Sequence, residues 1–331
     1  MSRVLTGDRP TGKLHIGHYV GSLKARIAMQ DSHEVFIIVA DVQALTDNFS
    51  CPEKIRENIL ESTIDNLAIG LNPDKVKFFI QSAIPEIAEL TIFFMNLVTH
   101  ARVLRNPTVK QELKSKNFRN PPFGFVAYPV SQAADILIVR ANLVPVGQDQ
   151  KPMIELARDI SKSFNKIYGC NVFPIPIGVY SANKVLVGID GKFKMSKSLN
   201  NAIFFSDSDE IIKEKVFNMY TDPNRIHPTD PGRVEGNPVF IYHDLFNKNV
   251  LEVQDLKERY VKGKVSDVEV KHRLFLALTE FIAPIRERRI YFEKNKDIVW
   301  DILRTGTSIV KKEAEHTLEL VREAIKIDYF K

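Results

Sequence analysis

The sequence has few cysteines and no long hydrophobic segment. Its two cysteines, Cys51 and Cys170, lie far apart and lack the CxxC spacing of a zinc site. The longest uninterrupted apolar run, residues 35–40, is far shorter than the roughly 20 residues that a membrane-spanning helix needs. The first apolar run follows Met1 almost at once, so we expect no signal peptide. These absences exclude membrane-embedded and disulfide-framework proteins, and we expect the chain to act in the cytoplasm.

The basic residues of the chain are unevenly distributed. The 331 residues are 44% hydrophobic and 26% charged, with a net charge of +5. That length predicts two domains. The excess of Lys and Arg lies in the first 206 residues, and it is densest between residues 102 and 119, where Glu112 is the one acidic residue. The basic residues there are Arg102, Arg105, Lys110, Lys114, Lys116 and Arg119. Such a group is either a solvated surface or a track for a polyanion.

Residues 6–24, TGDRPTGKLHIGHYVGSLK, hold the clearest local signal. Glycines and a proline end a short apolar run before helical spacing begins at about Leu14. His15 and His18, three residues apart, then share one face at the start of the helix. Unpaired N–H groups and the helix dipole favour anions such as phosphate at that end. The stretch therefore predicts an anion-binding turn.

Strand-like and helical segments alternate along the first half of the chain. Residues 34–40 and 76–81 have the length and β-branched content of buried strands, and residues 52–70 between them have helical spacing. The alternation predicts a Rossmann-like α/β fold with a doubly wound parallel sheet, which binds ligands at the carboxyl ends of its strands. We also expect a strand at 143–146, an irregular or edge segment at 171–180, and helices at 85–103, 130–139 and 153–168. From residue 209 on, helical patterns dominate, at 209–220, 239–246, 251–261, 268–295 and 297–327.

A second chemical signal lies in residues 186–201, LVGIDGKFKMSKSLNN. Lys194 and Lys197 can contact a polyphosphate as mobile point charges, and serine hydroxyls add hydrogen-bond donors. Taken alone, a lysine- and serine-rich loop is more often a solvent-exposed turn than a phosphate-binding site.

The two signals together resemble a known family. HIGH at 15–18 and KMSKS at 194–198 are similar to the signature pair of the class I aminoacyl-tRNA synthetases. Longer segments resemble the bacterial tryptophanyl-tRNA synthetases over essentially the whole chain. They are GDRPTGKLHIGHYVGSL, YPVSQAADI at 128–136, VPVGQDQKPMIELARDI at 144–160 and GKFKMSKSLNNAI at 191–203.

This resemblance implies a catalytic domain at 1–206, with a connective insertion at about 100–180. A helical anticodon-binding domain would follow at 207–331, its last helix able to pack back on the catalytic domain. The implied reaction joins L-tryptophan to the α-phosphate of ATP, which carries Mg²⁺ on its phosphates. The resulting tryptophanyl-adenylate then charges tRNA(Trp). The resemblance also implies a homodimer, without a DNA or membrane partner and without a protein-bound metal.

The resemblance further implies roles for single residues. His15 and His18 would donate hydrogen bonds to phosphate oxygens, and Lys194 and Lys197 would follow the departing pyrophosphate. The other implied ATP-binding residues are Arg9, Pro10, Thr11, Gly17, Gly147, Gln148, Asp149, Val185, Met195, Ser196 and Ser198, with Lys110 as a possible phosphate contact. The charge of Arg9 could assist phosphate binding or pair with the neighbouring aspartate.

A tryptophan pocket is implied around one helical face. Tyr128, Gln132 and Asp135 follow each other at i, i+4 and i+7 among apolar residues. In the family, the aspartate that matches Asp135 accepts a hydrogen bond from the indole N–H. Leu5 would line the same pocket. The polar residues of this face also resemble those of some tyrosyl-tRNA synthetases, which leaves that activity as an alternative.

Two further alternatives come from other classes of protein. A small-molecule nucleotidyltransferase can share the HxGH loop, although it would not need the long helical second half. A non-catalytic, synthetase-like RNA-binding protein could keep the fold without the activity. The intact histidines and lysines of both motifs argue against it.

Overall fold

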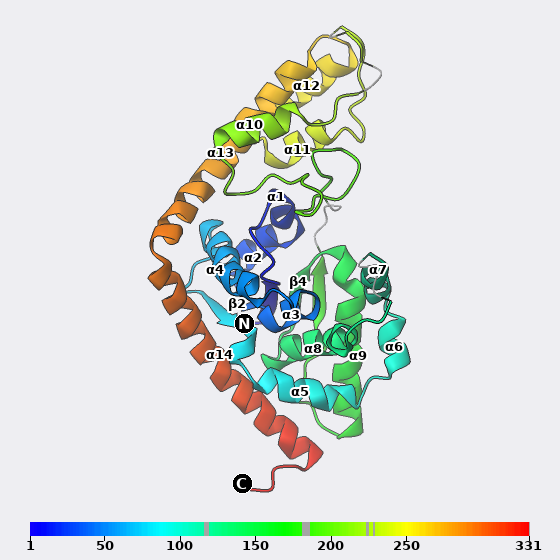
Figure 1. The fold of residues 1–331 in the computed structure, drawn as a ribbon, viewed down its shortest axis with the longest axis vertical. Helices are drawn as coiled ribbons and strands as arrows, with labels where there is room; N and C mark the ends of the chain where they lie inside the picture. The colour runs from blue at the N-terminus through cyan, green and yellow to red at the C-terminus, as the bar shows by residue number, and fades with distance from the viewer. Residues whose placement is uncertain (116–118, 181–185, 223–224, 228, 331) are drawn as a thin grey trace. The chain divides into compact units, whose positions relative to one another are not determined.

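The protein folds into two compact units (Figure 1). The first comprises Met1–Gly12, Ser22–Ala182 and Phe292–Lys331, and the second comprises Lys13–Gly21 and Asn183–Tyr291. The computed structural model describes residues 1–115, 119–180, 186–222, 225–227 and 229–330. The units have other bounds than the functional domains expected at 1–206 and 207–331, which stay a prediction. No helix in the described ranges is both long and apolar enough to cross a membrane.

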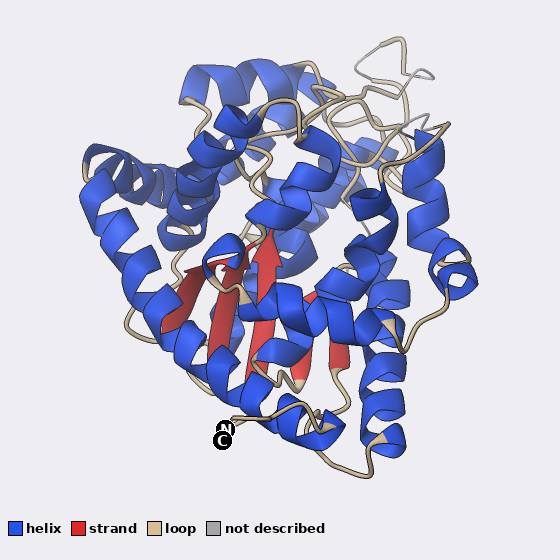
Figure 2. Ribbon diagram, turned by 60° about the horizontal axis from the view of Figure 1, so that its bottom comes forward, coloured by secondary structure: helices blue, strands red, loops and turns tan. Residues whose placement is uncertain are grey.

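A five-stranded sheet lies at the centre of the first unit, and its strands all run parallel (Figure 2). The strand order is β3-β2-β1-β4-β5. The strands are β1 (Arg3–Asp8), β2 (Glu34–Val39), β3 (Val76–Ile80), β4 (Leu143–Val146) and β5 (Ile177–Tyr180). The predicted Rossmann-like sheet is confirmed. Strands β2 and β3 are added on one side of β1, and β4 and β5 are added on the other side. The direction of strand addition therefore reverses between β1 and β4, and sheets of this kind bind ligands at such a point.

The helices of this unit cover both faces of the sheet or pack on the helices that cover it. They are α2 (Lys24–Met29), α3 (Asp41–Asn48), α4 (Pro52–Ala68), α5 (Glu86–Met95), α6 (His100–Leu104), α7 (Pro107–Ser115), α8 (Phe123–Ile138), α9 (Lys151–Ile167) and α14 (Lys296–Ile325). Short 3₁₀ turns follow β3 at Gln81–Ala83 and β4 at Gln148–Gln150.

Two helix predictions for this unit need correction, and one helix was not expected. The single helix expected at 85–103 is two helices, α5 and α6, because the chain becomes extended at Thr99, whose hydroxyl accepts the N–H of Arg102 as an N-cap. The helix expected at 130–139 begins earlier, at Phe123, and holds Pro129 in its interior. The polar stretch at 41–48, for which no helix was expected, forms α3.

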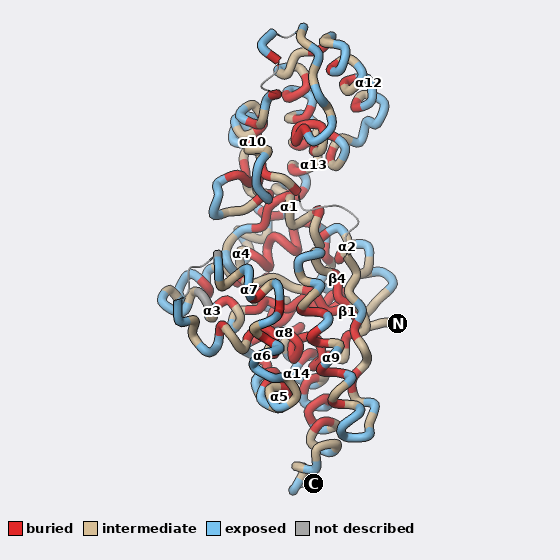
Figure 3. The backbone as a smooth tube through the Cα atoms, turned by 90° about the vertical axis from the view of Figure 1, so that its right-hand side faces the viewer, coloured by how far each residue is buried: buried red, intermediate tan, exposed pale blue. Residues whose placement is uncertain are grey.

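Successive residues of the central strands point into two separate cores. Val4 packs with Val35 and Ile37 on one face, whereas Leu5 packs with Phe36 on the other. Both faces are therefore buried, as in other parallel sheets covered by helices on two sides. Figure 3 shows the buried colour on the strands and on the inner sides of α8 and α9.

The long helix α14 packs against β3, one of the two edge strands of the sheet. Its Gly306 lies so near β3 that an added Cβ atom would sit 2.0 Å from the carbonyl oxygen of Phe78. The next residue, Thr307, accepts the N–H of Ile80 through its hydroxyl at 3.2 Å. An edge strand covered in this way offers few unpaired backbone groups to other chains.

The second unit is mainly helical. Its long helices are α10 (Asp209–Phe217), α11 (Pro238–Phe246), α12 (Val250–Val261) and α13 (Asp267–Lys294). The helices predicted from residue 209 on are confirmed, with ends shifted by a few residues. The N-terminal segment adds the short helix α1 (Ile16–His18), which continues into a π-helical turn at Tyr19–Leu23. The helix expected from about Leu14 is thus irregular, and π turns often occur at functional sites.

Candidate active site

The two histidines of the HIGH segment form a compact pair. Their ring centroids are 3.8 Å apart, and the backbone N–H of His15 donates to Nδ1 of His18 at 3.0 Å. A nitrogen that accepts a hydrogen bond carries no proton, so the neutral His18 ring holds its proton on Nε2. The backbone therefore selects the tautomer in which Nε2–H of His18 can donate to an anion.

His15 is buried in a cationic environment. Burial is the main cause that lowers its pKa to about 2, so the ring is neutral at physiological pH. Electrostatic interactions with the His18 ring and with the ammonium groups of Lys197 and Lys194 lower this pKa further. Nδ1 of His15 is buried and has no hydrogen-bond partner among the described residues. The structure thus brings the four predicted catalytic side chains into one cluster.

Gly17 allows the two motifs to meet. A Cβ atom at this position would lie 2.9 Å from Nδ1 of His15 and 3.2 Å from the sulfur of Met195. The backbones also join, because the N–H of Ile16 donates to the carbonyl of Ile203 at 3.0 Å. The contact between HIGH and KMSKS therefore depends on a residue without a side chain.

The KMSKS loop follows a short antiparallel pairing within residues 186–195. Val187 bridges to Lys194, and the side chain of Met195 is buried. Ser196 and Ser198 lie beside each other, with hydroxyl oxygens 3.0 Å apart. The amide of Asn201 bonds across the loop to the backbone N–H of Ser196. Sequence reasoning missed Asn201, although an asparagine close behind a functional loop is a frequent backbone anchor.

The first unit holds the residues predicted to bind tryptophan. Asp135 on α8 is 3% exposed, and its Oδ1 accepts a hydrogen bond from Nε2 of Gln81 at 2.8 Å. Burial raises the pKa of Asp135 to about 7, while the bond from Gln81 lowers it and the charge of Asp41 raises it. Gln81 was not predicted, although its place directly after a parallel strand is where such sheets position ligand-binding groups.

The other two polar residues of this α8 face have partners of their own. The hydroxyl of Tyr128 donates to Oε2 of Glu112 on α7 at 2.8 Å. Nε2 of Gln132 lies 3.4 Å from Oε1 of Gln150. Neither Glu112 nor Gln150 was predicted as part of the site. Leu5 is buried in the sheet core that also packs against α8.

The loop after β4 places three of the predicted ATP-binding residues, Gly147, Gln148 and Asp149, beside α7. An added Cβ atom at Gly147 would lie 2.6 Å from Oδ1 of Asp149, so the tight turn needs glycine. The hydroxyl of Thr108 donates to the backbone carbonyl of Asp149 at 2.9 Å. Lys110 is exposed on the same helix, two residues further on, and Gln148 is exposed in the loop. Lys110 thus lies on the helix that contacts this loop.

The turn after β1 is tight and partly buried. The N–H of Thr11 donates to the carbonyl of Arg9 at 2.8 Å, and Pro10 between them is buried. The neighbouring Asp8 binds the buried guanidinium of Arg26 through both of its carboxylate oxygens, at 2.6 and 3.0 Å. Asp8 thus anchors Arg26. Val185 lies outside the described residues.

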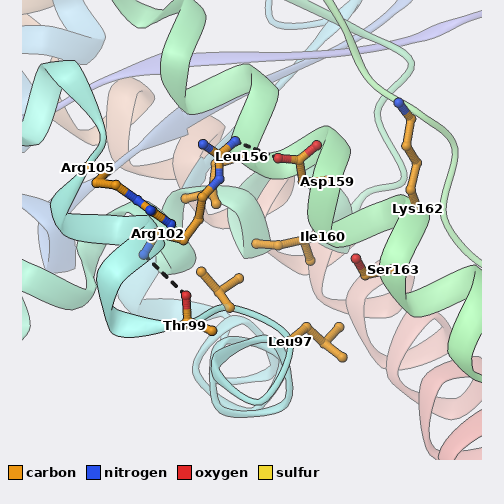
Figure 4. Close-up of a pocket in the computed structure, with 10 residues that line it drawn as sticks. Leu97, Thr99, Arg102, Arg105, Leu156, Asp159, Ile160, Lys162 and Ser163 are labelled. Carbon is orange, nitrogen blue, oxygen red and sulfur yellow. Dashed lines mark hydrogen bonds and ion pairs between the residues drawn. The ribbon is translucent and has the colours of Figure 1, made fainter.

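Two residues of the basic group, Arg102 and Arg105, border a cavity of about 490 Å³ in the first unit (Figure 4), whereas Lys116 of this group lies outside the described residues. Arg102 and Arg105 stand on one side of it, and Leu156 and Ile160 add apolar side chains to its lining. Asp159 pairs with Arg102 at 2.6 Å and offsets part of the positive charge. None of the described residues that were predicted to bind ATP or tryptophan lines this cavity.

Comparison with known proteins agrees with this grouping of motifs. Residues 1–283 match the family described as tRNA synthetases class I (W and Y). The chain belongs to the class I aminoacyl-tRNA synthetases. Among the members of this synthetase family, the tryptophan–tRNA ligase of Clostridium longisporum is 52% identical over 332 residues, covering 99% of this chain and 97% of that protein. The ligase of Streptococcus mutans is 50% identical over 335 residues, with coverages of 99% and 98%.

A solved synthetase structure is similar throughout. The tryptophanyl-tRNA synthetase of Campylobacter jejuni, complexed with ADP and tryptophan, matches with a TM-score of 0.87 at 30% sequence identity. The match covers 98% of this chain and 99% of that one. The synthetase fold therefore extends over both compact units.

Proposed function

We propose that the chain is an enzyme that activates L-tryptophan with ATP and transfers it to tRNA(Trp) for protein synthesis. The observation that carries the proposal is the meeting of HIGH and KMSKS, with Gly17 packed against Met195. Relatives that are half identical over the full length and are named tryptophan–tRNA ligases support tryptophan, rather than tyrosine, as the amino acid.

In the proposed first step, a carboxylate oxygen of tryptophan attacks the α-phosphorus of ATP. The bond to the bridging oxygen breaks, and the electron pair leaves with pyrophosphate. Such a transfer needs alignment and charge stabilisation more than covalent chemistry. Nε2–H of His18 would donate to a phosphate oxygen, and Lys194 and Lys197 would follow the departing charge. One preorganised donor of this kind lowers the activation free energy by roughly 3 kcal/mol.

Asp135 would select the amino acid by accepting the indole N–H. Its carboxylate is held by Gln81 and is almost fully buried, so a ring without an N–H would leave it without that partner. Tyr128, Gln132 and Leu5 are proposed as further lining of this pocket.

ATP would be held by the glycine-bearing turns and by the KMSKS loop. The proposed contacts are Arg9, Pro10, Thr11, Gly17, Gly147, Gln148, Asp149, Val185, Met195, Ser196 and Ser198, with Lys110 near the phosphates. Across the described residues, no group of three or more His, Cys, Asp or Glu side chains could hold a metal ion. We propose that Mg²⁺ enters on the phosphates of ATP and supplies charge neutralisation there.

The remaining proposals concern the whole enzyme. Residues 207–331 would bind the anticodon, two copies would form a homodimer, and the enzyme would act in the cytoplasm. Two free cysteines without a disulfide are compatible with a reducing compartment.

Amino-acid-dependent exchange of pyrophosphate into ATP tests the function directly. We expect robust exchange with tryptophan, little with tyrosine, and charging of tRNA(Trp) by the same preparation. Exchange with tyrosine alone would make the chain a tyrosyl-tRNA synthetase. Adenylylation of a metabolite without charging of any tRNA would indicate a nucleotidyltransferase, and RNA binding without adenylate formation a non-catalytic protein.

A further inference from the structure

The two ends of the loop that carries Lys194 and Lys197 lie close together in the structure. At its start, Lys194 is bridged to Val187 in the short antiparallel pairing. At its end, the backbone carbonyl of Asn201 accepts the N–H of Ile189 at 3.0 Å. Both ends of the loop are thus attached to the same hairpin, and we call this closure the neck of the KMSKS loop.

The side chain of Asn201 fills the neck. Its Oδ1 accepts the backbone N–H of Ser196 at 2.7 Å, and its Nδ2 donates to Oδ2 of Asp190 at 2.9 Å and to the carbonyl of Lys194 at 3.3 Å. The side chain is 2% exposed. The amide can face only one way, because a flip would set its oxygen against a carboxylate and its NH₂ against a backbone N–H.

The surrounding residues hold this amide in place. The other oxygen of Asp190, Oδ1, accepts the N–H groups of Lys192 and Phe193 at 3.0 and 3.2 Å, so the carboxylate is fixed to the turn of the hairpin. At Gly188, an added Cβ atom would lie 2.2 Å from Nδ2 of Asn201 and 2.9 Å from its Cβ. The neck is therefore shaped for the asparagine side chain as well as bonded to it.

We propose that Asn201 is a positioning residue for amino-acid activation, whose side-chain amide closes the neck and so fixes where Lys194 and Lys197 stand. The inference rests on the proposed function of these two lysines. Asn201 itself touches neither substrate in this proposal. It acts by holding the backbone of residues 194 and 196, the first of which carries a catalytic ammonium group.

Removing the amide should slow the chemistry without weakening tryptophan binding. For Asn201→Ala, we expect the kcat of tryptophan-dependent pyrophosphate exchange to fall by about a hundredfold, the effect of misplacing a catalytic group by about 1 Å. The KM for tryptophan should stay unchanged, because the predicted pocket residues lie in the other unit. Gly188→Ala should have a similar, smaller effect, because its methyl group would displace the amide.

A reciprocal exchange of the two polar residues isolates the contact between them. Asp190→Asn alone sets two NH₂ groups against each other, and Asn201→Asp alone sets two carboxylates against each other. The double variant restores one N–H···O bond between these positions with nearly the same shapes. We expect each single variant to lose kcat and the double variant to regain at least about tenfold over Asn201→Asp, as in a double-mutant cycle of contacting groups.

Matched measurements separate this role from a general loss of folding. Asn218→Ala removes an exposed asparagine side chain in the same unit and should leave kcat unchanged. Thermal unfolding of every variant gives the folded fraction, and the isosteric Asp190→Asn variant remains informative if Asn201→Ala fails to fold. An unchanged kcat in Asn201→Ala, or a double variant no better than Asn201→Asp, would overturn the proposal. Failure of wild-type exchange would instead overturn the proposed function.

Discussion

At the scale of single residues, Asp135 is a buried side chain whose ionisation falls in the working pH range. Burial raises its pKa to about 7. A charged carboxylate is a stronger hydrogen-bond acceptor than a neutral carboxylic acid. We expect the KM for tryptophan to fall as the pH rises from 6 to 8, and Asp135→Asn to have a higher KM without this dependence. A wild-type KM equally independent of pH would contradict Asp135 as the acceptor for the indole N–H.

The raised pKa of Asp135 also makes the stability of the folded protein depend on pH. The folded-state pKa of Asp135 lies above its ordinary value of 3.8. Its contribution to the free energy of unfolding is therefore fully present below pH 4 and is lost as the pH rises through about 7. Urea unfolding of the ligand-free enzyme should show this decrease relative to Asp135→Asn, which has no carboxyl group to titrate. Parallel pH profiles for the two proteins would rule the effect out.

Residues in short motifs could be predicted from the sequence, whereas their partners could not. His15 and His18 lie within four residues, and their type and spacing already indicate phosphate chemistry. Gln81 contacts Asp135 across 54 residues of chain, a pairing that only the folded sheet creates. Asn201 lies close behind its motif, but nothing in its type distinguishes it from the adjacent Asn200. The residues proposed to react could thus be named from the sequence, whereas the residues that contact them in the structure could not.

At the scale of elements, the contact between α14 and β3 depends on one glycine. Gly306 leaves no room for a methyl group against the carbonyl of Phe78. We expect Gly306→Ala to lower the free energy of unfolding by about 1–3 kcal/mol, the usual cost of overpacking, despite the better helix propensity of alanine. Ser308→Ala, at an exposed position on the same helix, is the control. Equal urea midpoints for both variants would show that the helix shifts to accept the methyl group.

Helices with long periodic patterns could be predicted, and those shaped by local contacts could not. The four helices α10 to α13 follow their apolar spacing closely. The break between α5 and α6 depends on the hydroxyl of Thr99 as an N-cap within an apolar run that reads as continuous. Helix α8 begins before Pro129 although proline usually interrupts helices, because tertiary burial outweighs local preference there. Element type was thus more predictable than element ends.

At the scale of the whole molecule, alternating strands and helices were enough to predict a parallel sheet. Its strand order could not be predicted from the sequence. The resemblance implied that the last helix can pack back on the catalytic domain, but not that it lies on β3, where Ile80 bonds to Thr307, 227 residues away. The division into two units was also out of reach. It places residues 13–21 with a segment that begins at Asn183.

Charge distribution gives a prediction for the molecule as a whole. RNA binding that releases counterions weakens steeply with salt, whereas tryptophan carries no net charge at neutral pH. Raising KCl from about 50 to about 200 mM should therefore increase the KM for tRNA at least about tenfold. The KM for tryptophan in pyrophosphate exchange should change little.

If the basic group at 102–119 contacts phosphates, Arg105→Gln should reduce the slope of log KM against log salt by about 1. Lys312→Gln, at an exposed position on α14, should not. Equal slopes in both variants would make the basic group a solvated surface, with the salt effect arising elsewhere.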